Sequence, residues 1–494
     1  MQATLLFWHI GLLTMWTDEL VTYDKVIHPV TRVLAMLRFD VHPPLYFLLV
    51  RLWLQLPLPG DVLERIRMFS GAWTLAATIL IDRLWLLRLR PSRRWLALAL
   101  WSFSPAALLY GRMGRSYLMQ TALAVIAIAM TWRFLRQPGV RRMATSAAAL
   151  ILLLYTHYVP GIAVAAAFAL GLATQAARKR SPRDLGLLAA WISLIALGYA
   201  PWLVQMREAL GKWTAGNGLS TQYLMTGSQA GEQIVKAGYG LVSFIAGECF
   251  PAPVLVLIPI VLLLLAASFS RLWKDSRGLM GLLLAAALIG YLGVAHWVSY
   301  PFIPPRLLWL LPFFLMWIAL SPGVRPALRN IVIAVLLASD GASLVSYFSQ
   351  ANFLNKSYVV PLPQIAERIA SSANPAGSLL LLDGYNTDSA VLLHYLHSAP
   401  EYHAPTSIVL DESTAAEAMA DLRDPRFRRI WVLRNTHDIS PHRLTSAIEA
   451  AACEGRRAHL TEYLPYAPWE RDAMRLVGIR QPPTYFYQLT ECTL

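Results

Sequence analysis

The chain has 494 residues, of which 56% are hydrophobic and only 15% are charged. Soluble domains carry about a quarter charged residues, so this composition excludes an ordinary soluble protein and indicates a polytopic membrane protein. The net charge is +14. Because most of that charge falls in short loops between apolar segments, orientation in a membrane explains it better than nucleic-acid binding does.

Apolar segments fill the chain up to about residue 350. They cover residues 1–15, 44–57, 66–88, 95–110, 117–135, 144–157, 160–176, 186–205, 252–270, 278–298, 307–320 and 330–348. The first run is short, since a membrane-spanning helix needs roughly 20 residues. It also lacks the basic start and the A-x-A site of a cleavable signal peptide. We therefore expect either a start further upstream or a first helix that is partly shielded by protein.

Five loops between these segments are basic. They are residues 88–94, 136–142, 177–183, 271–277 and 323–329. The positive-inside rule places all five in the cytoplasm. They can share one side only if segment 44–57 does not cross the membrane. That segment is short and carries Arg51 and Gln55, which favours an interfacial or re-entrant helix and leaves about eleven spans.

The opposite face then collects the polar residues that lie unusually close to apolar segments. These motifs are T-D-E-L (17–20), D-V-H-P-P-L-Y (40–46), Y-G-R-M-G-R-S-Y (110–117), T-H-Y (156–158) and P-P-R (304–306). The part of the chain after residue 350 should lie on the same face. We expect that compartment to be the periplasm or the cell exterior, with the protein in the cytoplasmic (inner) membrane.

The composition changes after residue 349, so the sequence predicts a membrane module over 1–349 and an extracytoplasmic α/β domain over 350–494. Strand-like runs occur at 378–383, 407–410, 429–434 and 484–489, and a helix-like run at 413–422. No Gly-rich phosphate loop follows any of them, and no CxxC motif indicates zinc or redox chemistry. Cys453 and Cys492 both fall in a compartment where disulfides persist, which leaves a bridge and two free thiols equally open.

Each polar motif has a plain structural reading beside a functional one. Asp18 and Glu19 could mark a solvated helix end, yet ionisable residues at the mouth of a span are functional by default. His42 could be a polar group at a helix entry, where Pro43 and Pro44 fix the turn, or a hydrogen-bond donor or metal ligand. His157 leaves the same choice between a structural hydrogen bond and a contact to phosphate or metal.

The arginines on this face are also ambiguous. Arginines at the start of a span often extend their side chains to lipid headgroups, which accounts for Arg112 or Arg115 without any function. Alternatively, guanidinium groups hold phosphate through charge-assisted hydrogen bonds. Arg306 is a further candidate for such a phosphate site.

Together these motifs resemble the GT-C glycosyltransferases. The residues that carry the resemblance are T-D-E (17–19), H-P-P-L-Y-F-L-L-V-R-L-W (42–53), S-P-A-A-L-L-Y-G-R-M-G-R-S-Y (104–117) and Y-T-H-Y (155–158). They are similar to the protein O-mannosyltransferase and aminoarabinose-transferase-like family (glycosyltransferase 39 type). The resemblance covers about the first 210 residues, and P-P-R-L-L-W-L-L-P (304–312) is similar to a later family segment. The domain after residue 350 carries no family signal.

The resemblance implies a membrane enzyme of the cell envelope. Such an enzyme moves a monosaccharide, a hexose or a pentose, from a polyprenyl-phosphate carrier to an acceptor hydroxyl or a lipid phosphate outside the cytoplasmic membrane, with inversion. The acceptor would be a lipid, a glycan or a protein. The acid of the family's first outer loop matches Asp18, which we expect to be the catalytic base. A carboxylate can remove the acceptor proton, and a phosphate leaving group needs positive charge rather than a second acid.

The resemblance also assigns the substrate-binding residues. The residues expected to bind substrate or shape its cavity are Glu19, Asp40, His42, Arg112, Arg115, Tyr117, His157 and Arg306. Arg115 and Tyr117 fit the Arg and Tyr of the family stretch. Arg112 and Met113 stand where a polar residue and an acid are usual, which argues against a second acid in this loop.

The sequence was also considered for a metal site and for two other functions. Some members of the superfamily bind a divalent metal in the outer cavity, but no fixed spacing here supports a metal site, and none is assigned. A transporter or flippase of a lipid-linked glycan would need ionisable residues near the bilayer midplane and related halves, and neither is visible. A non-catalytic scaffold that presents the C-terminal domain is a third reading.

Overall fold

The computed structural model describes residues 1–40, 42–215, 229–295, 303–372, 377–383, 388–398, 405–410, 413–435, 443–476 and 482–494. The chain divides into two compact units. The first comprises Met1–Gly11, Val21–Thr221 and Gln233–Leu354, and the second comprises Leu12–Leu20, Gln222–Glu232 and Asn355–Leu494. Residues 12–20, which the sequence analysis placed in the membrane module, therefore group with the C-terminal residues.

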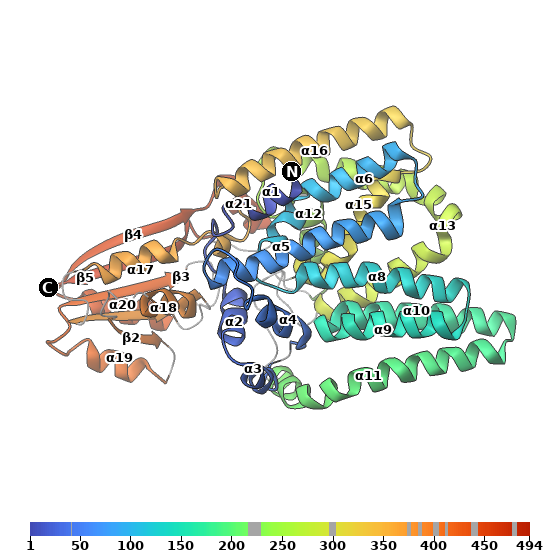
Figure 1. Cartoon of the computed structure of the whole chain (residues 1–494). Helices are drawn as coiled ribbons and strands as arrows, with labels where there is room; N and C mark the ends of the chain where they lie inside the picture. Colours follow the sequence, from blue (N-terminus) through green and yellow to red (C-terminus); the bar gives the residue numbers. More distant parts are fainter. Residues whose placement is uncertain are drawn as a thin grey trace. The chain divides into compact units, whose positions relative to one another are not determined.

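The first unit is helical (Figure 1). Its elements are α1 (Gln2–Phe7), most of α2 (Thr17–Val26), α3 (Val30–Leu37), α4 (Leu45–Trp53), α5 (Val62–Ile81), η1 (Asp82–Leu86), α6 (Pro91–Phe103), α7 (Pro105–Gly111), α8 (Tyr117–Arg136), α9 (Val140–Thr156), α10 (Tyr158–Lys179), α11 (Pro182–Ala215), most of α12 (Gln229–Ala246), η2 (Ala252–Val256), α13 (Leu257–Ala295), α14 (Ile303–Leu307), η4 (Leu308–Leu310), α15 (Leu311–Leu320) and α16 (Pro326–Phe348). Helix starts follow local sequence signals. Proline opens α6, α7 and α16, and a capping box between Asp61 and Glu64 opens α5.

Six helical stretches among the described residues are long and apolar enough to cross a membrane. They are Tyr117–Arg136, Tyr158–Lys179, Pro182–Gln205, Ala252–Ala295, Ile303–Leu320 and Pro326–Phe348. The fourth has 44 residues, about twice the length that one bilayer crossing needs. It bends at Ser276, whose φ and ψ are non-helical. These stretches confirm the predicted polytopic helical membrane protein.

The span count differs from the expected number of about eleven. The first apolar run forms only the six-residue helix α1 and then leaves the helical conformation, so it is no spanning helix. The predicted surface segment 44–57 contains the nine-residue helix α4. α6 and α7 are separated by Ser104 and Pro105, and α5 carries charged residues in its first turns. Short or interrupted helices therefore replace several of the predicted spans.

Helix α8 lies at the centre of the first unit. It contacts α5, α9 and α10, and Figure 1 shows α8, α9 and α10 running side by side. Of its membrane-spanning window, 78% is buried by protein, so α8 is apolar on all sides because it meets neighbouring helices on all sides. Its first residue, Tyr117, is the last residue of the Y-G-R-M-G-R-S-Y motif, which places that motif against the core of the unit.

The second unit contains a five-stranded sheet with flanking helices. Its elements are η5 (Lys356–Tyr358), α17 (Leu362–Ala370), β1 (Ser378–Asp383), α18 (Asp388–Ser398), β2 (Thr406–Leu410), α19 (Ala415–Asp421), β3 (Arg429–Asn435), α20 (Arg443–Cys453), β4 (Arg457–Pro465), α21 (Pro468–Leu476) and β5 (Tyr485–Thr493). The strand order is β2-β1-β3-β5-β4. β1 pairs in parallel with β2 and β3, and β5 pairs antiparallel with β3 and β4. The small α/β domain predicted after residue 350 is therefore confirmed.

The position of each strand in the sheet explains whether it could be predicted from the sequence. β1 is buried along its whole length, as a strand covered on both faces must be, and its run of leucines was visible in the sequence. β4 was not predicted. It lies at the sheet edge, is largely exposed and reads as a polar segment without clear alternation. Only its pairing with β5 makes it a strand.

Two further contacts organise the second unit. Cys453, which ends α20, and Cys492 on β5 form a disulfide, which resolves the alternative that the sequence left open. The segment before α2 packs against the same unit. The Thr14 hydroxyl donates to the Val360 carbonyl at 2.6 Å, and the Trp16 ring meets Tyr358 edge-on at 5.2 Å.

Candidate functional site

The start of α2 carries the two predicted acids, and they differ in environment. Glu19 is buried, and its Oε2 accepts a hydrogen bond from the backbone N–H of Trp16 at 3.0 Å. This carboxylate caps the N-terminus of the helix, because it accepts a hydrogen bond from a backbone N–H that has no partner within the helix. Asp18 beside it is only partly buried. Glu19 therefore helps to build the start of α2, whereas Asp18 is the less buried residue of the pair.

A partly buried chain of ion pairs and hydrogen bonds begins at Lys25 on the same helix. The Lys25 ammonium lies 2.8 Å from Oδ2 of Asp40, and Oδ1 of Asp40 accepts a hydrogen bond from Nδ1 of His42 at 2.5 Å. The backbone N–H of His42 donates to the same oxygen at 3.0 Å. Phe47 packs beside both basic groups, 5.8 Å from the Lys25 nitrogen. Both oxygens of Asp40 are therefore engaged by positive or donating groups.

Arg115 closes this chain into a ring. Its Nη2 donates to Nε2 of His42 at 2.9 Å, and its Nη1 donates to the Thr22 hydroxyl at 3.1 Å. Thr22 and Lys25 are three residues apart on α2, which puts them on one face of the helix. Lys25, Asp40, His42, Arg115 and Thr22 form this ring, which we call the Arg115–His42 ring.

The ring fixes the tautomer of His42 and the ionisation of Asp40. Because a guanidinium can only donate, Nε2 of His42 is the acceptor and Nδ1 carries the proton given to Asp40. Burial by itself raises the pKa of Asp40. The adjacent His42 and Lys25 outweigh that effect and hold the pKa well below its ordinary value. Asp40 is thus a carboxylate throughout the physiological range.

The backbone of Arg115 is held by Ser70 of α5, which also contacts a tyrosine of another predicted motif. The Ser70 hydroxyl of α5 donates to the Arg115 carbonyl at 3.1 Å and also contacts the Tyr46 hydroxyl at 3.1 Å. Tyr46 belongs to H-P-P-L-Y. Gly111 lets the arginine loop approach α5, because a Cβ there would lie only 2.5 Å from the Thr74 hydroxyl oxygen. The motif tyrosine and the motif glycine therefore serve to place Arg115.

His157 and Arg306 complete the group. His157 caps the N-terminus of α10, with Nδ1 accepting from the Val159 N–H at 3.3 Å, and it is buried. Arg306, His42 and Arg115 all lie close enough to act on it electrostatically. The segment of Arg306 is fixed to α8 by Gln120, whose amide donates to the Pro305 carbonyl at 2.7 Å. Four predicted residues from distant motifs therefore converge.

Arg112 takes a different place from Arg115. Its guanidinium donates to the carbonyls of Leu5, Leu6, Trp8 and His9, which end α1, and its Nε donates to the Tyr347 hydroxyl at 2.9 Å. A cation at the C-terminus of a helix satisfies its last carbonyl groups. These contacts favour a structural role, and Arg112 is left out of the phosphate site proposed below.

Tyr117 lies in the core rather than at an open surface. It is buried at the start of α8 and meets the Tyr110 ring edge-on at 5.6 Å. The Tyr110 hydroxyl in turn donates to the carboxylate of Glu248, which is fully buried. Glu248 was not singled out from the sequence because it follows α12 in a stretch without any motif.

The residues of the ring do not suit a metal ion. Among the described residues, no group of three or more His, Cys, Asp or Glu side chains is placed to hold one. Asp40 and His42 face each other and two cations, Lys25 and Arg115. Neighbouring positive charge opposes a divalent cation. The reaction proposed below therefore assigns no step to a metal.

Sequence reasoning missed the residues of α2 that close the ring. Lys25 and Thr22 follow Asp18 at helical spacing on one short segment. One signal in the sequence was Lys25 itself, because the positive-inside rule predicts few lysines on the outer side of the membrane. Ser70 and Gln120 hold their partners from helix faces whose sequence indicates only a packed core.

Comparison with known families and with curated proteins finds no match. Among solved structures, ArnT from Cupriavidus metallidurans bound to undecaprenyl phosphate is similar over 99% of this chain and 96% of its own, at 10% identity and a TM-score of 0.47. Its apo state gives 11% identity and a TM-score of 0.48 over the same shares of the two chains. The archaeal oligosaccharyltransferase AglB from Archaeoglobus fulgidus, in complex with an inhibitory peptide and a dolichol-phosphate, matches 84% of this chain and 63% of its own, at 13% identity and a TM-score of 0.43. Likenesses at this level assign no role to any residue.

Proposed function

We propose that this protein is a GT-C-type membrane glycosyltransferase. It would transfer a monosaccharide from a polyprenyl-phosphate carrier to an acceptor hydroxyl or lipid phosphate on the outer face of the cytoplasmic membrane. The observation that carries the proposal is the convergence of Arg115, His42, His157 and Arg306 in one buried to partly buried cluster, together with the motifs that resemble this family. The second unit would lie on the same outer face.

The cluster suits a phosphate that gains charge. Among the described residues whose contacts join the cluster, Lys25, Arg115 and Arg306 are cations and Asp40 is a carboxylate, so positive charge exceeds negative charge. Preorganised donors in a buried site stabilise developing negative charge far better than water-exposed groups do. Arg115 is the main proposed phosphate ligand. His157 would add a donor, because its Nδ1 is used as an acceptor and its other nitrogen then carries the proton.

The proposed reaction is a single displacement with inversion. Asp18 removes the proton of the acceptor hydroxyl as that oxygen attacks the anomeric carbon of the sugar. The bond from the anomeric carbon to the phosphate oxygen breaks, and its electron pair goes to the carrier phosphate, which leaves with one additional negative charge. Arg115 and Arg306 stabilise that charge. Asp18 precedes Thr22 by four residues on α2, so the two share a helix face, which supports this role.

The test compares three carboxylates of α2. Asp18→Asn should lower transfer at least about 100-fold, since general-base catalysis contributes 10²- to 10⁴-fold. The purified variant should keep the unfolding temperature of the wild type. Transfer is measured as donor-dependent labelling of extracted envelope acceptors by mass spectrometry.

Two matched variants serve as controls. Glu19→Gln preserves a side chain that can accept from the Trp16 N–H, and Asp24→Asn changes an exposed acid of the same helix. Both should retain transfer within a few-fold. Near-normal transfer by Asp18→Asn would remove the assignment of the base.

The alternative of a lipid-linked glycan flippase predicts movement without chemistry. Proteoliposomes that contain a labelled polyprenyl-phosphate sugar separate the two functions. A flippase would move the label across the bilayer with the sugar–phosphate bond intact. The transferase consumes the donor and releases polyprenyl phosphate only when an acceptor is present.

A further inference from the structure

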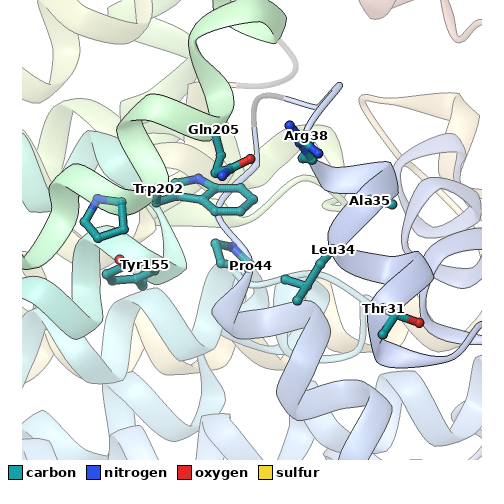
Figure 2. A pocket seen from close by; sticks show the side chains of 9 residues that line it. Thr31, Leu34, Ala35, Arg38, Pro44, Tyr155, Trp202 and Gln205 are labelled. Atoms are coloured by element: carbon teal, nitrogen blue, oxygen red, sulfur yellow. The ribbon is translucent and has the colours of Figure 1, made fainter.

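A pocket of about 530 Å³ lies in the first unit, lined by residues of α3, α9 and α11 and by Pro44. Its lining residues are Thr31, Leu34, Ala35, Arg38, Pro44, Tyr155, Pro201, Trp202 and Gln205. Figure 2 shows Trp202 and Gln205 of α11 across from Leu34 and Arg38 at the end of α3, with Pro44 between them. None of the predicted site residues lines this pocket.

The wall formed by α11 contains the buried indole of Trp202, whose N–H lacks an acceptor among the described residues. Trp202 is only 5% exposed, and within the part of the chain that the structure describes its indole Nε1–H has no hydrogen-bond partner. Buried indole N–H groups normally find an acceptor, because leaving one unpaired is costly. Trp202 directly follows Pro201, which interrupts the backbone bonding of α11.

The charge of the pocket has one sign. Among the described residues that line it, Arg38 is the one charged residue and none is an acid. Gln205 adds an amide and Thr31 a hydroxyl, while Leu34, Pro44 and the Trp202 ring are apolar. The pocket therefore offers donors and one positive charge at the side of an apolar wall. Such a wall suits a ligand that joins an anionic oxygen group to a body with an apolar face.

The pocket is rigidly tied to the proposed reaction site. Pro44 follows His42 by two residues, and Tyr155 precedes His157 by two. The Tyr155 hydroxyl donates to the Gly198 carbonyl at 3.0 Å, and its ring meets Tyr199 edge-on at 5.3 Å, which fixes α9 to α11.

We propose that this pocket binds the acceptor, and that the acceptor presents a phosphate or carboxylate to Arg38 and the Trp202 N–H. The assignment to the acceptor rests on the proposed function, in which the Arg115–His42 ring holds the donor phosphate. The binding site itself stands on the pocket and the unpaired indole.

The test measures binding rather than turnover. The full-length protein in nanodiscs of neutral lipid is titrated with three probes: dodecyl phosphate, glucose 1-phosphate and inorganic phosphate. Arg38→Met keeps the apolar stem and removes the charge, and should weaken binding about 10-fold. Trp202→Phe keeps an aromatic ring and removes the N–H, and should weaken it about 5-fold.

Controls separate this site from its neighbours. Arg32→Met changes an exposed arginine of the same helix that does not line the pocket, and should bind within 2-fold of the wild type. Arg115→Gln should lose transfer, and the probe binding that remains in this variant should still be weakened about 10-fold when Arg38→Met is added. Unfolding temperatures of all variants confirm that the fold is retained.

The outcomes decide the proposal in either direction. Tight binding of dodecyl phosphate alone supports a lipid acceptor, and tight binding of glucose 1-phosphate alone supports a soluble glycan acceptor. Binding of neither, or equal binding by Arg38→Met and wild type, overturns the site. If inorganic phosphate binds as tightly as the larger probes, the apolar wall does not contribute to binding, which contradicts the proposed ligand. Loss of binding in Arg38→Met with normal transfer in Asp18→Asn would leave the pocket standing and remove the proposed base.

Discussion

Arg112 and Arg115 lie three residues apart in one motif, yet their side chains contact different parts of the first unit. Arg112 holds the last carbonyls of α1, whereas Arg115 joins His42 and Thr22. The spacing of two arginines in a loop does not predict which partner each contacts, because a loop side chain can point in several directions. The contacts with α1 and with the His42 segment make the distinction.

The two arginines should therefore fail differently on substitution. Arg115→Gln should reduce transfer about 100- to 1,000-fold, as the loss of one preorganised donor does, with little change in stability. Arg112→Ala removes several charge-assisted hydrogen bonds and should lower the free energy of unfolding by about 3 kcal/mol. Thermal unfolding and transfer assays on the same preparations measure both. The opposite pattern would contradict a structural role for Arg112 and a phosphate-binding role for Arg115.

The contacts of Asp40 change the role that was predicted for it. It was expected to shape the substrate cavity, and its carboxylate is bound by Lys25 and His42. Its lowered pKa has a definite consequence for stability. A group with a lowered folded-state pKa contributes stability fully above its unfolded pKa, which is about 3.9, and loses that contribution as the pH falls towards the folded value.

Asp40→Asn should thus destabilise the protein most at pH 5 to 8. Removing one partner leaves the largely buried Lys25 without its carboxylate, which costs on the order of 3 kcal/mol. The gap in unfolding free energy between wild type and variant should narrow below about pH 4, where the wild type starts to lose the same interaction. A gap that stays constant from pH 3 to pH 8 would contradict this electrostatic origin.

At the scale of elements, local sequence patterns predicted most of the structure. The four strands that were predicted correspond to β1, β2, β3 and β5, and the long apolar runs form helices. The failures share a cause. The first apolar run reads as a span, but it folds as α1 and then as an irregular segment that packs with the second unit. β4 reads as polar and becomes a strand by pairing with β5.

The bond between α20 and β5 gives a test at this scale. Cys453 and Cys492 are separated by 39 residues, and closing a loop of that length stabilises a domain by about 3 to 4 kcal/mol in the chain-entropy picture. Replacing both cysteines with serine should make the second unit more sensitive to limited proteolysis on heating. Dithiothreitol should sensitise the wild type to the same degree and leave the double variant unchanged.

At the scale of the whole molecule, the sequence alone determined that this is a membrane protein with a C-terminal α/β domain. It also determined which motifs carry the charged residues. These properties follow from composition and from local periodicity, which act over a few turns of chain. Only the tertiary structure decided that Lys25 pairs with Asp40, that Arg115 reaches His42 and that Trp202 faces a pocket. Those contacts join residues from different helices, and their geometry depends on how the helices pack rather than on any neighbouring residue in the sequence.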